Sequence, residues 1–174
     1  VCALVDASHP FAQRITANAV AAARQVDVPQ LMLRRPAWPL DCQSFDSADT
    51  LAAAFPGGAR VFLTVGRGDT APYVRRQDVT FVLRSIEPVE GLPGHIVRTQ
   101  GRPPFSLDNE IAFMREAKIT HLITKNAGGA APSKLEAAKA LGVEVLSIAM
   151  PPVPPNTTVA ESVDVALAWL KDLP

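Results

Sequence analysis

The sequence has little of what marks a secreted, metal-binding or membrane-spanning protein. Its 174 residues include only two cysteines, Cys2 and Cys42, which lie far apart and without the spacing of metal ligands. Cysteines this sparse suggest neither a disulfide framework nor a zinc site, so we expect no bound metal and take the cytoplasm as the default location. No apolar run approaches the roughly 20 residues of a membrane span, and no signal-peptide pattern opens the chain.

The chain also lacks an excess of charge of either sign. Lysine plus arginine and aspartate plus glutamate both number 17. A balanced chain has no general attraction for nucleic acid or for an anionic membrane, so we expect neither as a partner. Any anion site must then be built locally, from a few residues in particular loops.

Familiar catalytic signatures are missing as well. The sequence contains no Walker loop, no G-x-G-x-x-G motif, no G-x-S-x-G elbow and no pair of carboxylates at glycosidase spacing. It also contains no repeat of fixed period and no low-complexity segment. The function must therefore be inferred from several loops taken together, because none of them is specific by itself.

What the sequence does contain is an alternation of short apolar runs with helical patterns. The runs expected to form strands are 1–5, 30–34, 60–65, 80–85, 95–99, 121–125 and 144–149. Helices are expected from Pro10, over 47–55, 106–117 and 132–141, and from a capping box of Thr158 and Glu161 to Leu170. This alternation predicts an α/β fold with parallel sheets. The glycine pair 57–58 is the expected domain boundary, which gives domains 1–57 and 58–174.

Residues that follow the strands are the candidates for ligand binding, because open parallel sheets bind ligands beyond the carboxyl ends of their strands. The richest such loop reads K-N-A-G-G, residues 125–129, and Lys125 and Lys134 flank its glycines. Glycines of this kind let backbone N–H groups approach a phosphate or a carboxylate. The loop T-V-G-R-G, residues 64–68, has the same character. The alternative for both loops is an ordinary tight turn with solvated basic residues.

The segment D-A-S-H-P, residues 6–10, places an acid, a hydroxyl and an imidazole between a strand and a helix. It does not form a catalytic triad, because Ser8 and His9 are adjacent and point in different directions. One alternative makes Ser8 or His9 the helix cap and Asp6 an acceptor for nearby backbone N–H groups. The other offers a neutral imidazole to a cleft, since a helix N-terminus disfavours the cationic form.

Several segments, in this order, resemble the precorrin-6A reductase family of cobalamin biosynthesis. They are D-A-S-H-P-F-A, R-R-P-A-W, F-L-T-V-G-R, V-L-R-S-I-E-P, P-P-F-S-L-D-N-E, T-K-N-A-G-G-A-A-P-S-K-L and V-L-S-I-A-M-P-P-V-P. The resemblance extends from Val5 to about Pro155. It implies two Rossmann-like domains and an NADPH-dependent oxidoreductase. The implied reaction adds a hydride and a proton across one double bond of a tetrapyrrole that carries several carboxylates.

The resemblance also implies roles for the loop residues. The residues expected at the reacting groups, as catalytic or positioning residues, are Asp6, Ser8 and His9. The residues expected to contact the cofactor are Thr64, Gly66, Arg67, Asn126, Gly128 and Gly129. The residues expected to bind substrate carboxylates are Arg35, Arg84 and Lys125.

The family pattern is present only in part. Members normally begin with a strand and a glycine-rich G-G-T-x-E loop, and no such loop occurs in this sequence. We therefore expect the first Rossmann-like domain to be incomplete, with Val1 inside a strand. The residues leave two other functions open: a non-catalytic module that binds an anionic small molecule, and an enzyme that acts on a small phosphate ester.

Overall fold

The computed structural model describes residues 2–64, 70–130 and 132–173. The strands are β1 Leu4–Asp6, β2 Gln30–Leu33, β3 Gln43–Phe45, β4 Arg60–Leu63, β5 Thr80–Ser85, β6 Ile96–Gln100, β7 His121–Lys125, β8 Glu144–Ile148 and β9 Thr158–Ala160. The helices are α1 Gln13–Gln25, α2 Ala48–Ala53, α3 Ala71–Val74, α4 Leu107–Glu116, α5 Ser133–Leu141 and α6 Val163–Lys171. The strands form two parallel sheets, so the expected α/β fold is confirmed.

The chain divides into two compact units at a different place from the one expected. Unit 1 comprises 1–39, 127–130 and 150–174, and unit 2 comprises 40–126 and 131–149. The division therefore comes after Pro39 and not at the glycine pair 57–58. The physical reason is strand pairing: β3 pairs with β8 in the sheet of unit 2, whereas β9 pairs with β2 in the sheet of unit 1.

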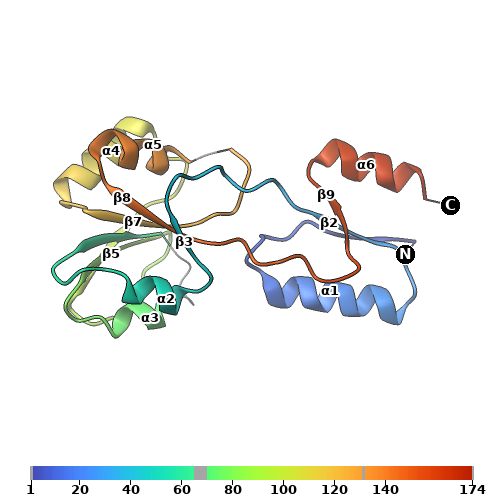
Figure 1. The fold of residues 1–174 in the computed structure, drawn as a ribbon, viewed down its shortest axis with the longest axis horizontal. Coiled ribbons are helices and arrows are strands. Elements are labelled where there is room, and N and C mark those ends of the chain that lie inside the picture. Colours follow the sequence, from blue (N-terminus) through green and yellow to red (C-terminus); the bar gives the residue numbers. More distant parts are fainter. Residues whose placement is uncertain (1, 65–69, 131, 174) are drawn as a thin grey trace. The chain divides into compact units, whose positions relative to one another are not determined.

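Unit 2 is built on a six-stranded parallel sheet in the order β3-β8-β7-β4-β5-β6. Helices α4 and α5 cover one face of this sheet, and α2 and α3 cover the other (Figure 1). Strands that are covered on both faces are apolar along their whole length, as the central run V-F-L of β4 shows. The core joins Phe62 and Leu122 of the sheet with Met114 of α4 and Ala137 of α5.

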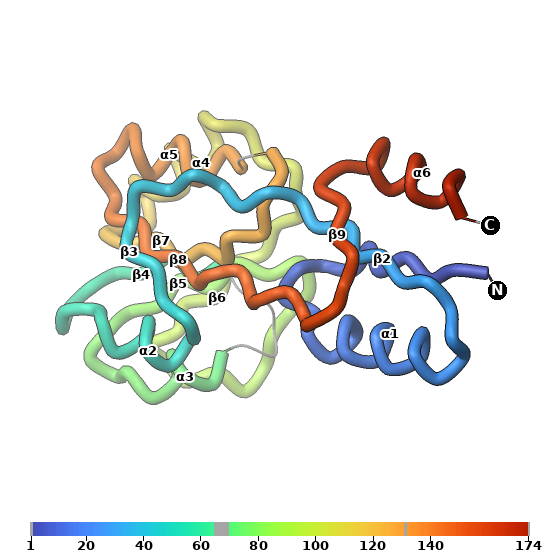
Figure 2. The backbone as a smooth tube through the Cα atoms, turned by 45° about the vertical axis from the view of Figure 1, so that its right-hand side comes forward, coloured from blue at the N-terminus to red at the C-terminus, as the bar shows by residue number. Residues whose placement is uncertain are grey.

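Unit 1 is built on a three-stranded parallel sheet in the order β1-β2-β9, with α1 on one face and α6 on the other (Figure 1). Figure 2 shows the red strand β9 beside the blue strand β2, although more than half of the chain separates them. Leu31 of β2, Ala160 of β9 and Ala166 of α6 form a small buried core. The sheet of unit 1 thus depends on a segment from the end of the chain.

The first helix begins later than expected. Pro10 lies in a turn, and α1 starts at Gln13 with Ala12 as its N-cap residue. Among the residues that the structure describes, no side chain makes a capping hydrogen bond at this helix start. The interpretation of Ser8 or His9 as the helix cap is therefore wrong, because both residues lie a full turn before the helix starts.

The last helix also begins later than expected. Thr158 and Val159 belong to β9, where they pair with β2, so Thr158 is not an N-cap residue and forms no capping box with Glu161. The N-cap is Ser162, whose Oγ accepts a hydrogen bond from the N–H of Val165 at 3.2 Å. The β-branched residues at this position suit an extended strand better than a helix start.

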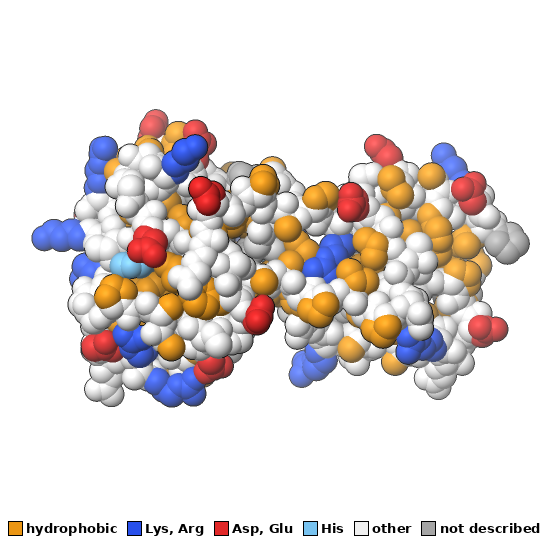
Figure 3. Space-filling view, viewed as in Figure 1, with side chains coloured by type: hydrophobic (Ala, Val, Ile, Leu, Met, Phe, Trp, Pro, Cys, Tyr) orange, Lys and Arg blue, Asp and Glu red, His pale blue; other side chains and the backbone are white. Residues whose placement is uncertain are grey.

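Charged side chains of both signs occur on the surface. On the face drawn in Figure 3, acidic and basic side chains are interspersed and neither forms a continuous patch. Among the described residues, no helix combines the length and the apolar character needed to cross a membrane.

Candidate active site

The segment after β1 borders a cavity of unit 1. This cavity has a volume of about 190 Å³, and its lining includes Asp6, Ser8, Thr16, Arg34 and Pro151. It lies past the carboxyl ends of β1 and β2, which is where parallel sheets bind their ligands. We call it the unit 1 cavity.

Asp6 is a buried acceptor at the edge of this cavity. Its Oδ2 accepts a hydrogen bond from the Thr16 hydroxyl at 2.7 Å, and its Oδ1 accepts one from the Ser8 backbone N–H at 3.0 Å. Burial works to raise the pKa of Asp6, but its contacts with Ser8 and Thr16 outweigh burial and hold that pKa below its ordinary value. Asp6 is therefore ionised at neutral pH, so it orders this loop and is not a proton donor.

Ser8 and His9 have different surroundings. The Ser8 Oγ is buried at the unit 1 cavity, where the Ser8 side chain helps to lower the pKa of Asp6. His9 is exposed, and its Nδ1 accepts a hydrogen bond from the N–H of Phe11 at 3.3 Å. Of the three expected catalytic residues, the structure thus places Asp6 and Ser8 at the cavity, and the roles of all three stay predictions.

The glycines at 128 and 129 lie against the segment that follows β2. Both have positive φ, and a Cβ added to Gly128 would lie 2.3 Å from the carbonyl oxygen of Pro36. The Gly129 N–H donates to that same oxygen at 3.3 Å, and its carbonyl accepts from Trp38 Nε1 at 2.8 Å. The neighbouring Arg35 is exposed, and its side chain lies against Gly129. This close approach explains the glycines without a ligand, which favours the tight-turn alternative.

The remaining expected residues lie in unit 2 or outside the described residues. Gly66 and Arg67 lie outside the described residues. Lys125 and Asn126 lie at the end of β7 in unit 2, where the Asn126 N–H donates to the Ile148 carbonyl at 3.1 Å. The backbone donor of Asn126 is thus used within the sheet, and its role in binding a cofactor stays a prediction, as does that of Lys125 in binding substrate.

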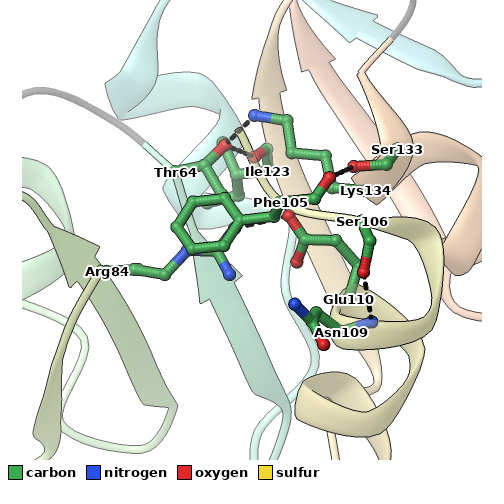
Figure 4. A network of polar contacts seen from close by, with 9 residues as sticks. All are labelled: Thr64, Arg84, Phe105, Ser106, Asn109, Glu110, Ile123, Ser133 and Lys134. Atoms are coloured by element: carbon green, nitrogen blue, oxygen red, sulfur yellow. Dashed lines mark hydrogen bonds and ion pairs between the residues drawn. The ribbon is translucent and has the colours of Figure 1, made fainter. Parts of the chain in front are cut away.

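In unit 2, a chain of hydrogen bonds connects the end of β4 with the start of α5 (Figure 4). Lys134 Nζ donates to Oγ1 of Thr64 at 2.7 Å, and this hydroxyl donates to the Ile123 carbonyl at 2.8 Å. Because the hydroxyl proton goes to Ile123, the Thr64 oxygen is left to accept from the ammonium. The Lys134 ammonium is therefore held in one position.

Beside it lies a buried ion pair (Figure 4). Arg84 Nη2 donates to Glu110 Oε1 at 2.6 Å, and the two side chains are only 12% and 2% exposed. The Arg84 guanidinium stacks on the Phe105 ring at 3.7 Å from its centroid. Arg84 thus already has a carboxylate partner within the protein, and a role in binding a substrate carboxylate stays a prediction.

Lys134 was not among the site residues expected from the sequence. Burial lowers its pKa to about 8, although the charge of Glu110 opposes the shift and that of Arg84 adds to it. One signal in the sequence pointed to Lys134: a lysine in the first turn of a helix opposes the helix dipole, which calls for an anion or a special role nearby. Glu110 was recognisable only as a first-turn acid of α4.

These residues border a second cavity, which we call the unit 2 cavity. It has a volume of about 540 Å³, and its lining includes Thr64, Arg84, Phe105, Glu110 and Lys134. It combines an apolar ring with a cation whose pKa lies close to neutrality, a combination typical of catalytic sites. Within the described ranges, no cluster of three or more histidine, cysteine, aspartate or glutamate side chains could hold a metal ion.

Comparisons with known proteins all point to one family. Residues 1–171 match the family model described as precorrin-6x reductase CbiJ/CobK. The chain is 42% identical to the precorrin-6A reductase of Rhodococcus erythropolis, over 99% of this chain and 73% of that protein. It is 37% identical to the precorrin-6A reductase of Mycobacterium tuberculosis H37Rv, over 99% and 72%. A solved structure of CobK precorrin-6A reductase matches with a TM-score of 0.88 at 32% identity, over 99% of this chain and 73% of that one.

Proposed function

Because the chain belongs to the precorrin-6x reductase CbiJ/CobK family, we propose that it reduces precorrin-6A to its dihydro product in cobalamin biosynthesis. The observation that carries the proposal is the family match over residues 1–171. The chain is accordingly an oxidoreductase that acts on a carbon–carbon double bond of a tetrapyrrole. One carbon of that bond gains a hydride and its neighbour gains a proton.

The hydride donor in this proposal is a reduced nicotinamide cofactor, specifically NADPH. The unit 1 cavity fits a polar part of such a molecule, because the Ser8 hydroxyl lines it and can donate to or accept from a bound group. Arg34 lines the same cavity and is held by hydrogen bonds to Met150 Sδ and the Pro151 carbonyl. Ser8 and Arg34 would hold the cofactor, which supplies the hydride, while the chain orients it and excludes water.

The unit 2 cavity suits one edge of the macrocycle. Phe105 offers an apolar surface for the ring system, and Lys134 offers hydrogen-bond donors and positive charge. In this proposal, Arg35 and Lys125 bind carboxylates at the periphery of the macrocycle. Arg84 is also part of this proposal. Because Glu110 already neutralises its charge, Arg84 would contact the macrocycle through the flat surface of its guanidinium more than through its charge.

The experiment is a spectroscopic assay of the full chain with NADPH and precorrin-6A. Oxidation of NADPH that depends on added precorrin-6A, with a product heavier by two hydrogen atoms, supports the proposal. Tight binding of the tetrapyrrole without oxidation of NADPH would instead indicate a non-catalytic binding module. NADH in a parallel reaction tests the choice of cofactor.

A substitution in the unit 1 cavity tests whether this cavity binds the cofactor or the substrate. Ser8→Ala is expected to raise the Kd for NADPH several-fold and to leave tetrapyrrole binding unchanged. Ser44→Ala, on exposed β3, makes the same chemical change away from both cavities and serves as the control. Equal NADPH affinity in all three proteins would contradict the placement of the cofactor at Ser8.

A further inference from the structure

Reduction of a carbon–carbon double bond requires a proton donor as well as a hydride donor. We infer that Lys134 is this donor, and that its ammonium protonates the macrocycle carbon next to the one that receives the hydride. The inference rests on the proposed function. The groups that line the unit 2 cavity, the hydrogen bonds of Lys134 and the balance of the reaction support the inference.

The other charged groups at the unit 2 cavity cannot serve. Arg84 cannot act as the acid, because a guanidinium does not release its proton in proteins. Glu110 is engaged in the ion pair with Arg84, whose guanidinium donates to its Oε1 at 2.6 Å, and an ion-paired carboxylate acts as an acceptor. Among the described lining residues, Lys134 is therefore the group that can release a proton near neutral pH and then recover it.

The geometry leaves protons of Lys134 available. One N–H of the ammonium is directed to Thr64 Oγ1 at 2.7 Å, which fixes the nitrogen at the cavity wall. An ammonium has three N–H donors, and hydrogen bonds with described residues occupy one of them, so two can be offered to a bound molecule. Thr64 cannot turn its own proton towards Lys134 without giving up its bond to the Ile123 carbonyl. Thr64 is thus a positioning residue for the acid.

The electrostatic surroundings suit an acid that works at neutral pH. The pKa of about 8 keeps Lys134 protonated at pH 7, yet makes its proton far easier to release than that of an ordinary lysine. Burial of the ammonium is the main cause, and the nearby Arg84 acts in the same direction. Glu110 limits the shift, so the acid form persists at the pH of the reaction.

Atoms and electrons balance in this step. One carbon of the double bond gains the hydride with its electron pair, and the reduced nicotinamide is thereby oxidised. The neighbouring carbon uses the former π electrons to form a bond to a proton from Lys134 Nζ. The N–H bond breaks and leaves a neutral amine, which regains a proton from water before the next turnover.

The test compares two substitutions that separate acidity from charge. Lys134→Arg keeps the positive charge and the N–H donors but cannot release a proton at neutral pH. Lys134→Gln loses both the positive charge and the ability to release a proton. For an acid, both variants lower kcat by about 100-fold or more, and Lys134→Arg changes KM for precorrin-6A little. Lys139→Gln, on the exposed surface of the same helix, is the matched control and should behave as the wild type.

The pH dependence gives a second readout. The wild-type kcat should fall as pH rises through about 8, where Lys134 loses its proton, and this decline should be absent from the residual activity of Lys134→Arg. The ¹⁵N resonance of Lys134 Nζ, assigned by its loss in that variant, should titrate over the same range without substrate or cofactor. Lys134→Ala should recover activity when ethylammonium is added, because this small amine can replace the missing acid. Such a rescue would show that the loss in Lys134→Arg does not come from poor packing of the larger arginine.

Two results would overturn the inference. If Lys134→Arg keeps the wild-type kcat and Lys134→Gln raises only KM, the residue anchors a substrate carboxylate and another group donates the proton. If the wild type itself does not oxidise NADPH with precorrin-6A, the proposed function fails and the inference fails with it. Turnover by the wild type therefore shows whether the inference about Lys134 fails alone or together with the proposed function.

Discussion

Lys134 donates a hydrogen bond of 2.7 Å to Thr64, a residue that lies 70 positions earlier in the chain. The bond connects the first turn of α5 with the residue after β4, at the carboxyl edge of the six-stranded sheet. It holds a cation where the helix dipole and the burial of the ammonium both disfavour positive charge. This contact is the reason to regard the unit 2 cavity as chemically active.

Thr64→Val is expected to lower the pKa of Lys134 below its value of about 8. Valine has nearly the same shape as threonine but no oxygen to accept from the ammonium, so the charged form loses a stabilising contact. A ¹⁵N NMR titration of Lys134 Nζ measures the change. Thr64→Ser restores the hydroxyl and should return the pKa towards the wild-type value, and an unchanged titration in Thr64→Val would contradict this account.

Glu110→Gln is expected to destabilise the protein by about 3 kcal/mol, because it leaves the buried Arg84 charge without its carboxylate partner. It should also lower the pKa of Lys134, whose charged form Glu110 favours. Urea unfolding measures the first effect and NMR titration the second. Glu116→Gln, an exposed position on the same helix, should stay within about 0.5 kcal/mol of the wild type. Equal stability of the two variants would show that the pair contributes little.

Gly128→Ala and Gly91→Ala form a matched pair that isolates a steric clash. The two glycines have nearly the same φ, +70° and +72°, but a Cβ on Gly128 would meet Pro36 O at 2.3 Å whereas one on Gly91 would meet nothing within 4 Å. Gly91→Ala should destabilise by about 1–2 kcal/mol through the left-handed conformation alone. Gly128→Ala should cost about 2 kcal/mol more, because the backbone must shift.

The measurement for this pair is the free energy of unfolding in denaturant. Similar losses for the two variants would mean that the loop can move away from Pro36. In that case the close approach would not explain the glycine, and the expected role of the loop in binding a cofactor would gain support.

Asp6→Asn should change how the free energy of unfolding depends on pH below about 4. The pKa of Asp6 is lower in the folded protein than the ordinary 3.8, so its ionised form contributes stability above that pH. This contribution is lost as pH falls from 3.8 through the lower folded value, and Asp6→Asn should lack that loss. Free energies of unfolding measured across this range test the prediction. Thr16→Val, which removes a donor to Oδ2, should produce a weaker form of the same change.

Some features followed from the sequence because their physical causes are local. Ser47 and Ser106 were expected at helix starts, and each accepts a hydrogen bond from an N–H three residues later, at 3.2 Å. Gly142 ends α5 with a φ of 66°, as a left-handed C-cap requires. The order of strands and helices was equally readable, because covered parallel strands are apolar throughout. The family was recognisable because its motifs are short and contiguous.

The tertiary structure decided what depends on pairing between distant segments. Thr158 and Val159 could begin a helix or extend a strand, and only their pairing with β2 makes them a strand. The same pairing assigns the end of the chain to unit 1. The site was decided in this way too: Arg84 gained Glu110 as its partner, and Lys134 gained Thr64. Local propensity indicates most of the helices and strands, but register and burial determine which segments pair and which side chains meet, and here that meeting creates the chemistry.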